Sequence, residues 1–140
     1  SLNVARSKSR DARRRADLNQ LRLALDLFFD SNNAYPNSGG FRSSEVGDPY
    51  YQDSYIHGLA PTYIATLPKD PIGGAGAPNP PCTSPYKRAY YYYSVSPFLE
   101  YALLSHCAVE NVWNNSDPFY DSFRSTWAWK VCVGATGCAL

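Results

Sequence analysis

The chain of 140 residues contains no methionine, only two histidines, and no apolar run near the roughly 20 residues that a membrane-spanning helix needs. With His57 and His106 as the only histidines, a histidine-rich metal centre is excluded. The four cysteines form no C-x-x-C pair, which argues against a zinc ribbon and against a thioredoxin-like redox pair. A formal net charge of +1 excludes a broadly basic nucleic-acid-binding protein. The length of the chain predicts one domain, large enough to bury about 70% of the surface that the unfolded chain exposes.

The cysteines are expected to form two disulfide bonds in an oxidising compartment. They accompany 11 prolines and 9 glycines, a composition compatible with a disulfide-stapled chain. Cys132 with Cys138 would close a small terminal loop and leave Cys82 with Cys107, and we favour this pairing. A bridge between Cys107 and Cys132 across the sheet is the alternative.

Charge and hydrophobicity both change along the N-terminal segment. Residues 1–22 carry seven basic and two acidic side chains, a formal charge of +5, whereas the remaining residues carry −4. Residues 3–31 contain no Pro or Gly and are rich in Ala, Arg, Leu and Asp, which predicts one helix of roughly 40 Å. Apolar residues recur at helical spacing only from Leu18 onward, so the second half of the helix should pack on the body, whereas the first half need not.

The rest of the chain predicts a long loop followed by a small antiparallel sheet. Asn33 and Pro36 end the helix, and Pro and Gly punctuate residues 37–88, including the run at 78–81. Within this loop we expect a short helix at 55–60 and an extended segment at 62–67. Residues 89–95 and 100–108 predict a β-hairpin around Ser96 and Pro97.

A third strand is predicted at residues 125–133, followed by a closing loop at 134–140. Large apolar residues alternate there with small or polar ones, so Trp127, Trp129, Val131 and Val133 should share the face that packs on the helix. The expected fold is α+β, with a long N-terminal helix packed on a small antiparallel sheet and a long intervening loop. The expected core between helix and sheet consists of Leu18, Leu21, Leu25, Phe28, Trp127 and Trp129.

Several segments, in this order, resemble the type IV pilin and type II secretion pseudopilin family. The helix resembles the family's stem in residues 5–14 (ARSKSRDARR), 17–21 (DLNQL) and 24–30 (ALDLFFD), and residues 33–36 (NAYP) resemble its end. Residues 63–64 (YI) with 67–71 (LPKDP), the tyrosines at 91–93 and the segment from 101–104 (YALL) to Asn111 are similar to the passages that follow in the family. These segments cover roughly half of the chain, and their order carries more weight than any one of them.

The resemblance implies a pilin-like domain divided into a helical stem at 1–31, a variable loop region at 32–88, and a sheet with a C-terminal loop at 89–140. It implies a preceding apolar segment that anchors the subunit in the inner membrane before assembly and packs in the filament core afterwards. Because the chain begins with Ser1 and a charged helix, we expect that segment to have been removed.

The exposed half of the stem is then expected to carry filament assembly or to lie near lipid headgroups. We also consider i,i+4 ion pairs between Asp11 and Arg15 or between Arg13 and Asp17, against the alternative of a solvated helix face. The stem residues concerned are Arg6, Lys8, Arg10, Asp11, Arg13, Arg14, Arg15 and Asp17.

No residue pattern predicts a catalytic centre or a cofactor. His106 beside Cys107 could suggest a thiol nucleophile, but adjacent strand residues point to opposite faces, so a structural disulfide at Cys107 is favoured. Asp117 and Asp121 are weak calcium candidates in a segment that otherwise reads as a polar turn. The glycines at 73–76 lack the strand, helix and lysine of a P-loop.

Two binding features remain open at this level. The tyrosines at 50, 51, 55, 63 and 90–93 could form a surface that stacks on sugars or nucleic acid, or could fill the core. Residues 114–116 match a glycosylation consensus, which chance produces often. We therefore expect a structural subunit of a surface filament, serving adhesion, motility, DNA uptake or secretion, with other copies and other pilins as partners. The alternatives are a secretion pseudopilin and a minor tip pilin that binds a glycan or DNA.

Overall fold

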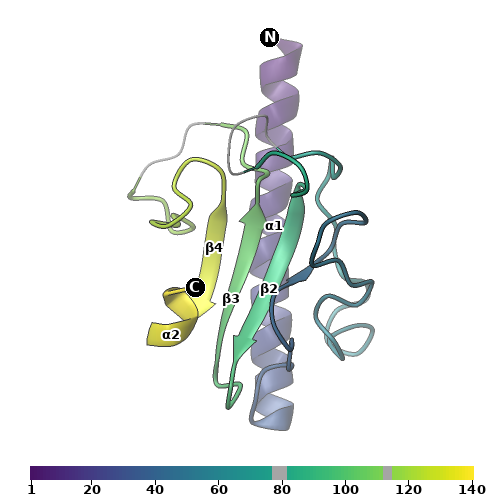
Figure 1. The fold of residues 1–140 in the computed structure, drawn as a ribbon, viewed down its shortest axis with the longest axis vertical. Helices are drawn as coiled ribbons and strands as arrows, with labels where there is room; N and C mark the ends of the chain where they lie inside the picture. The colour runs from purple at the N-terminus through teal and green to yellow at the C-terminus, as the bar shows by residue number, and fades with distance from the viewer. Residues whose placement is uncertain (77–81, 112–114) are drawn as a thin grey trace.

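The computed structural model describes residues 1–76, 82–111 and 115–140, and it combines one long helix with an antiparallel sheet (Figure 1). The proline run at 78–81 and Asn114 of the glycosylation motif lie outside these residues. In chain order the elements are α1 Leu2–Asn32, β1 Arg42–Ser43, β2 Ala89–Val95, β3 Glu100–His106, β4 Trp129–Val133 and α2 Ala135–Cys138. The predicted α+β class is confirmed.

Helix α1 begins and ends on residues suited to those positions. The hydroxyl oxygen of Ser1 accepts a hydrogen bond from the Val4 N–H at 3.3 Å, which caps the first turn. At the other end Asn33 adopts a left-handed conformation with φ of 56°, and its N–H donates to the Phe29 carbonyl at 2.7 Å. The helix predicted for 3–31 is therefore confirmed, and Asn33 ends it as expected.

The sheet has the order β1-β2-β3-β4, with every neighbouring pair antiparallel. Strands β2 and β3 form the predicted hairpin, with Tyr92 opposite Leu103. Strand β4 returns along β3, with Val131 also opposite Leu103. Because successive strand residues face opposite sides, this register gives the sheet an inner face toward α1 and an outer face away from it.

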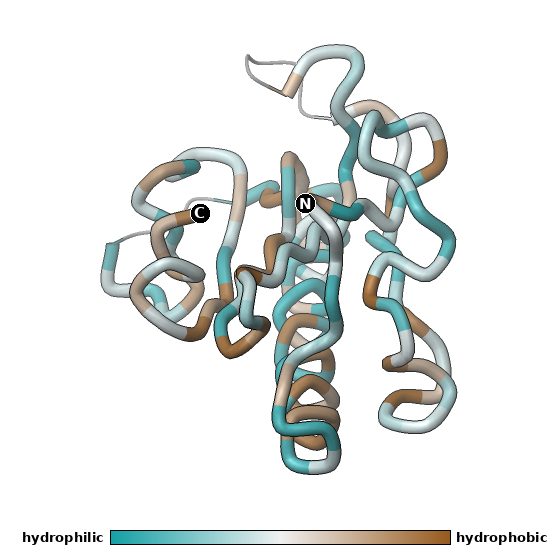
Figure 2. The backbone as a smooth tube through the Cα atoms, turned by 60° about the horizontal axis from the view of Figure 1, so that its bottom comes forward, coloured by the Kyte–Doolittle hydropathy of each residue, from teal (hydrophilic) through white to brown (hydrophobic). Residues whose placement is uncertain are grey.

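The main core lies between α1 and the inner face of the sheet (Figures 1 and 2). In Figure 2 the brown, hydrophobic segments of α1 concentrate in the half away from the N-terminus. Three residues of that half, Leu18, Leu21 and Leu25, are completely buried, and Phe28 packs at the margin. The sheet contributes Tyr90, Tyr92, Tyr101, Leu103 and Trp129.

The loop region at 32–88 helps to complete this core. Tyr55, Ile56 and Leu59 are buried against the same cluster, and the Tyr55 hydroxyl donates to the Pro68 carbonyl at 2.7 Å. A loop held in this way contributes to the stability of the body. The short helix predicted at 55–60 and the extended segment predicted at 62–67 are wrong, because turns occupy both stretches.

Trp127 does not belong to the core between helix and sheet, so that prediction is wrong. Strand β4 begins at Trp129, and residues before it turn, with the N–H groups of Trp127 and Ala128 both donating to the Arg124 carbonyl. Strand alternation therefore does not reach Trp127. Its ring instead meets His106 edge-on at 5.0 Å, on the outer face.

Two regular elements were not predicted. Strand β1 is a two-residue edge strand paired with Tyr91 and Tyr92, too short to give a periodic pattern. Helix α2 occupies four residues of the expected closing loop. Its last residue, Cys138, forms the second disulfide with Cys132 of β4.

Both disulfides have the favoured connectivity. Cys82 pairs with Cys107, and Cys132 pairs with Cys138. The first bond joins the loop region to the end of β3. The second joins β4 to α2, so it holds the C-terminal segment against the sheet.

Candidate functional site

The first candidate surface is the stem half of α1, which contains a buried arginine. Arg14 has no exposed side-chain surface, and its Nε and Nη2 donate to the two Asp70 oxygens at 2.7 and 3.1 Å. Its Nη1 donates to Asp11 at 2.9 Å and to Glu110 at 2.7 Å. Burial lowers the pKa of Arg14, but these carboxylates raise it above its usual value. Arg14 therefore stays charged and fixes α1 to the loop region and to the segment after β3.

Asp11 and Glu110 extend this network. The Asp11 carboxylate accepts from the backbone N–H groups of Glu110 and Asn111 and from the Asn111 amide at 2.7 Å. Arg10 donates two hydrogen bonds to Glu110, at 2.7 and 2.6 Å. These bonds from Arg10, aided by Arg14 and opposed by burial, lower the pKa of Glu110 to about 2. The carboxylate is thus ionised at every ordinary pH.

Most of the basic residues of the stem pair with carboxylates of the same chain. Arg10 and Arg14 pair as described, and Arg15 pairs with Asp117, with its guanidinium 4.2 Å from the centre of the Trp129 ring. The predicted pair between Arg13 and Asp17 is present at 3.1 Å. The predicted pair between Asp11 and Arg15 is absent, because each side chain has another partner.

Asp17 also has a second, buried partner. The Tyr90 hydroxyl donates to it at 2.6 Å, and burial together with this carboxylate raises the pKa of Tyr90. Among the stem residues considered, Arg6, Lys8 and Arg13 are the exposed cations. The stem is therefore bound to its own body along one face from Ser7 onward, and the other face is open.

That open face carries an unusual composition. Nine exposed residues between Leu2 and Leu27 lie along one side of α1, opposite Leu18, Leu21 and Leu25, and apart from one adjacent pair they are three or four positions apart. We call them the outer stripe: Leu2, Ala5, Ser9, Ala12, Ala16, Asn19, Gln20, Leu23 and Leu27. None of these nine is charged, although the exposed face of a surface helix usually carries most of its charges. The first charged residue on this side is the exposed Asp30, three residues after Leu27. Leu2, Leu23 and Leu27 are 64%, 62% and 47% exposed.

The two calcium candidates are engaged by cations. Asp117 pairs with Arg15, and its pKa is lowered first by that hydrogen bond. Asp121 is completely buried and pairs with Arg124 at 2.9 Å and with Lys130 at 3.4 Å. Across residues 1–76, 82–111 and 115–140, no three His, Cys, Asp or Glu side chains gather in a way that could hold a metal ion. Both candidates are thus held in ion pairs with basic side chains of the same chain.

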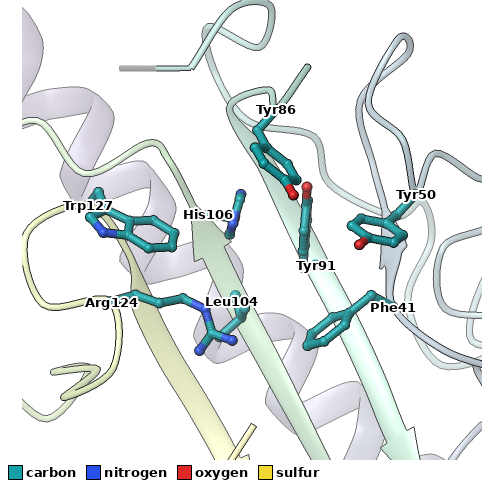
Figure 3. Close-up of a pocket in the computed structure, with 8 residues that line it drawn as sticks. All are labelled: Phe41, Tyr50, Tyr86, Tyr91, Leu104, His106, Arg124 and Trp127. Carbon is teal, nitrogen blue, oxygen red and sulfur yellow. The ribbon is translucent and has the colours of Figure 1, made fainter. Parts of the chain in front are cut away.

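The second candidate surface is a pocket of about 190 Å³ on the outer face of the sheet (Figure 3). Its lining residues are Phe41, Tyr50, Tyr86, Tyr91, Leu104, His106, Arg124 and Trp127. Tyr91, Leu104 and His106 are buried and come from β2 and β3. The others are at least partly exposed and come from the segments around β1 and before β2 and β4.

His106 braces the aromatic side chains of this pocket. Its ring stacks on Tyr91 with centres 4.0 Å apart, and its Nδ1 is buried without a hydrogen-bond partner. Burial, and then the nearby Arg124, lower the pKa of His106 to about 3, so the imidazole is neutral. The Tyr91 hydroxyl donates to Asp48 at 2.6 Å, and this bond ties the floor of the pocket to the loop region.

Five of the eight tyrosines considered in the sequence lie either in the core or in the pocket. Tyr55, Tyr90 and Tyr92 fill the core, whereas Tyr50 and Tyr91 line the pocket. Sequence reasoning did not select Phe41, Arg124 or His106 for such a site. Alternation along the two strands of the hairpin was the available signal, since it places Tyr91, Leu104 and His106 on one face once the register is known.

Comparison of the chain with protein-family models, with curated proteins and with solved structures finds no match. None of the helices in the described parts of the chain is long and apolar enough to cross a membrane.

Proposed function

We propose that this chain is a subunit of a type IV pilin-like surface filament and that it polymerises through α1. The observation that carries the proposal is the outer stripe, a side of α1 that is exposed and uncharged from Leu2 to Leu27. Leaving Leu2, Leu23 and Leu27 in water forgoes about 25 cal/mol for each Å² of apolar surface that a partner could cover. A face of this kind is suited to packing against another helix.

The shape of the molecule supports assembly through this helix. At 1.5 Å per residue, the 31 residues of α1 span roughly 46 Å. The N-terminal turns extend beyond the end of the sheet (Figure 1), where the body does not cover them. The same stripe meeting a different surface of the next copy is a heterologous contact, and such contacts repeat into an open filament.

The charges beside the stripe are suited to the same role. Arg6 and Arg13 border it on one side, and Lys8 borders it on the other. In the filament these cations would face acidic groups of neighbouring bodies, which carry a net formal charge of −4 beyond residue 22. Before assembly they would lie near anionic lipid headgroups of the inner membrane. The proposed location is accordingly a cell-surface filament whose subunits are membrane-anchored before assembly.

The ion pairs of the stem give α1 the rigidity that this function needs. Arg14, Asp11 and Glu110 hold the inner side of the helix to the body at the level where the sheet ends. A helix fixed in this way presents its outer stripe at one angle, and a repeating contact requires that each copy has the same geometry.

The test combines microscopy with matched variants of the protein as its cells produce it. We expect electron microscopy of sheared surface filaments, with mass spectrometry of their tryptic peptides, to identify this chain as a component. Leu23→Glu is expected to abolish filaments, because it places a charge in the packed stripe. Val46→Glu is the control, since Val46 is 63% exposed, close to the 62% of Leu23, but lies on the body.

Both substitutions replace an exposed apolar side chain, so the free energy of unfolding should change by less than about 0.5 kcal/mol in either variant. Normal filaments from cells with Leu23→Glu, at normal levels of folded protein, would contradict assembly through the stripe. Surface filaments that contain no peptide of this chain would contradict the filament role itself.

A further inference from the structure

We infer that the pocket on the outer face of the sheet is a binding site for a single pyranose ring of a glycan. The inference goes beyond the proposed filament role and does not depend on it. The pocket lies on the side of the sheet opposite α1, so occupation of the outer stripe leaves it accessible.

Three segments far apart in the sequence converge to build the pocket. Figure 3 shows Trp127 and Arg124 on one side, Phe41 and Tyr50 on the other, and the β2–β3 hairpin between them. Tyr50 is 41% exposed, whereas Tyr91, Leu104 and His106 at the base are 3%, 1% and 7% exposed. The site is thus a concave hollow with a buried floor and accessible walls.

The size of the hollow limits the occupant to about one ring. Its volume of about 190 Å³ is below the roughly 300–1,000 Å³ of sites for drug-sized ligands. A long apolar chain or an extended peptide segment does not fit such a space. One terminal residue of a larger molecule does.

The chemistry of the walls favours a sugar. The C–H bonds on one side of a pyranose carry partial positive charge and pack against the negative face of an aromatic ring. Trp127 is the largest accessible ring in the pocket, and His106 holds its position by an edge contact at 5.0 Å. The aromatic walls therefore provide a stacking surface for the ring, while its hydroxyl groups need polar partners.

Arg124 supplies such a partner in a fixed position. Its Nη1 donates to Asp121 and to the Leu140 oxygen, each at 2.9 Å, which holds the guanidinium at the wall. A guanidinium has five N–H donors, so these two bonds leave donors for the oxygens of a vicinal diol. The lining includes no carboxylate that would compete for them.

The same lining disfavours nucleic acid, the other ligand considered for the tyrosines. Grooves for single strands combine stacking rings with a row of cations along the phosphates. Here the lining has one cation, and Asp121 already neutralises much of its charge. Stacking without such a row fits an uncharged ring better than a polyanion.

The experiment titrates the 140-residue chain with methyl glycosides of glucose, galactose, mannose, fucose, N-acetylglucosamine and N-acetylgalactosamine. Binding is followed by saturation-transfer and amide chemical-shift NMR. A one-ring ligand is expected to have a dissociation constant on the order of millimolar. Trp127→Ala should weaken binding by about tenfold, in keeping with the loss of one stacked ring.

Two further variants make the result interpretable. Phe123→Ala removes an aromatic side chain of the same loop that is 65% exposed and is not part of the lining, so its affinity should stay within about twofold. Tyr50→Ala removes the opposite wall of the pocket and should also weaken binding. It tests the inference independently if Trp127→Ala does not fold. The amide spectrum of each variant reports its fold.

Four results would overturn the inference. The first is an absence of binding by every glycoside, and the second is an equal loss of affinity in Trp127→Ala and Phe123→Ala. The third is binding of para-cresol with no glycoside bound, which would assign the pocket to an aromatic side chain of a partner protein. The fourth is self-association of the chain that Trp127→Ala abolishes, which would assign the pocket to a second copy.

Discussion

Replacing Arg14 by methionine should destabilise the protein strongly, although Arg14 lies in a segment whose sequence looks like a solvated basic stem. Methionine retains most of the side-chain volume but removes the charge and all donors. Asp70, whose side chain is completely buried, then keeps only the N–H groups of Ile72 and Gly73 as partners. Asp11 loses its cation as well.

The magnitude follows from the burial of these charges. Removing one partner of a buried ion pair typically costs about 3–5 kcal/mol, because the remaining charge is left without compensation. A domain of this kind is stable by about 5–15 kcal/mol, so the loss is a large fraction of the total. For its size, the midpoint temperature should fall by roughly 10–15 °C.

The matched control is Arg13→Met, the same substitution one residue earlier. Arg13 has a side chain 62% exposed and one ion pair, and Asp17 retains its hydrogen bond from Tyr90. An exposed pair of this kind contributes about 0–1 kcal/mol. The assay is chemical denaturation followed by circular dichroism with both disulfides intact, which gives the free energy of unfolding of each variant.

A double variant separates lost charge pairing from lost packing. Adding Asp70→Asn to Arg14→Met removes the uncompensated charge but keeps the oxygen that caps the turn, so it should restore about 1 kcal/mol or more. If Arg14→Met and Arg13→Met differ by less than about 1 kcal/mol, the argument that Arg14 holds α1 to the body is refuted.

Two further predictions concern acid and reduction. The pKa of Glu110 is lowered from 4.5 to about 2 in the folded state, so its contribution to stability is present above about 4.5 and is lost as the pH falls toward 2. Glu110→Gln should therefore flatten the acid side of the stability profile measured by denaturation; an unchanged profile would contradict this. The Cys82–Cys107 bond closes a separation of 25 residues and the Cys132–Cys138 bond one of 6, so paired serine variants should lose about 3.5 and about 2 kcal/mol on the chain-entropy model. A larger loss of thermal stability on removal of the Cys132–Cys138 bond than of the Cys82–Cys107 bond would contradict this prediction.

Much of the fold could be predicted because its signals are local. The length and end of α1 follow from the absence of Pro and Gly before Asn33, and the β2–β3 hairpin follows from two β-prone runs around Pro97. The cysteine pairs could be favoured because Cys132 and Cys138 are close in sequence. Strand β1 could not be predicted, since two residues carry no period and its existence depends on pairing with β2.

The candidate sites depended on contacts between distant residues. Local pattern made Arg13 and Arg14 equivalent, yet one is exposed and the other is buried, because Asp70 and Glu110 reach the latter from 56 and 96 positions away. Trp127 was assigned to the wrong face because a turn before β4 breaks the alternation that its spacing suggested. Local sequence patterns thus sufficed for the helix, its buried side and the existence of the hairpin, but not for which hairpin tyrosines face the core. The partners of the buried charges and the aromatic pocket were settled only by folding, which brings together side chains that no local period relates.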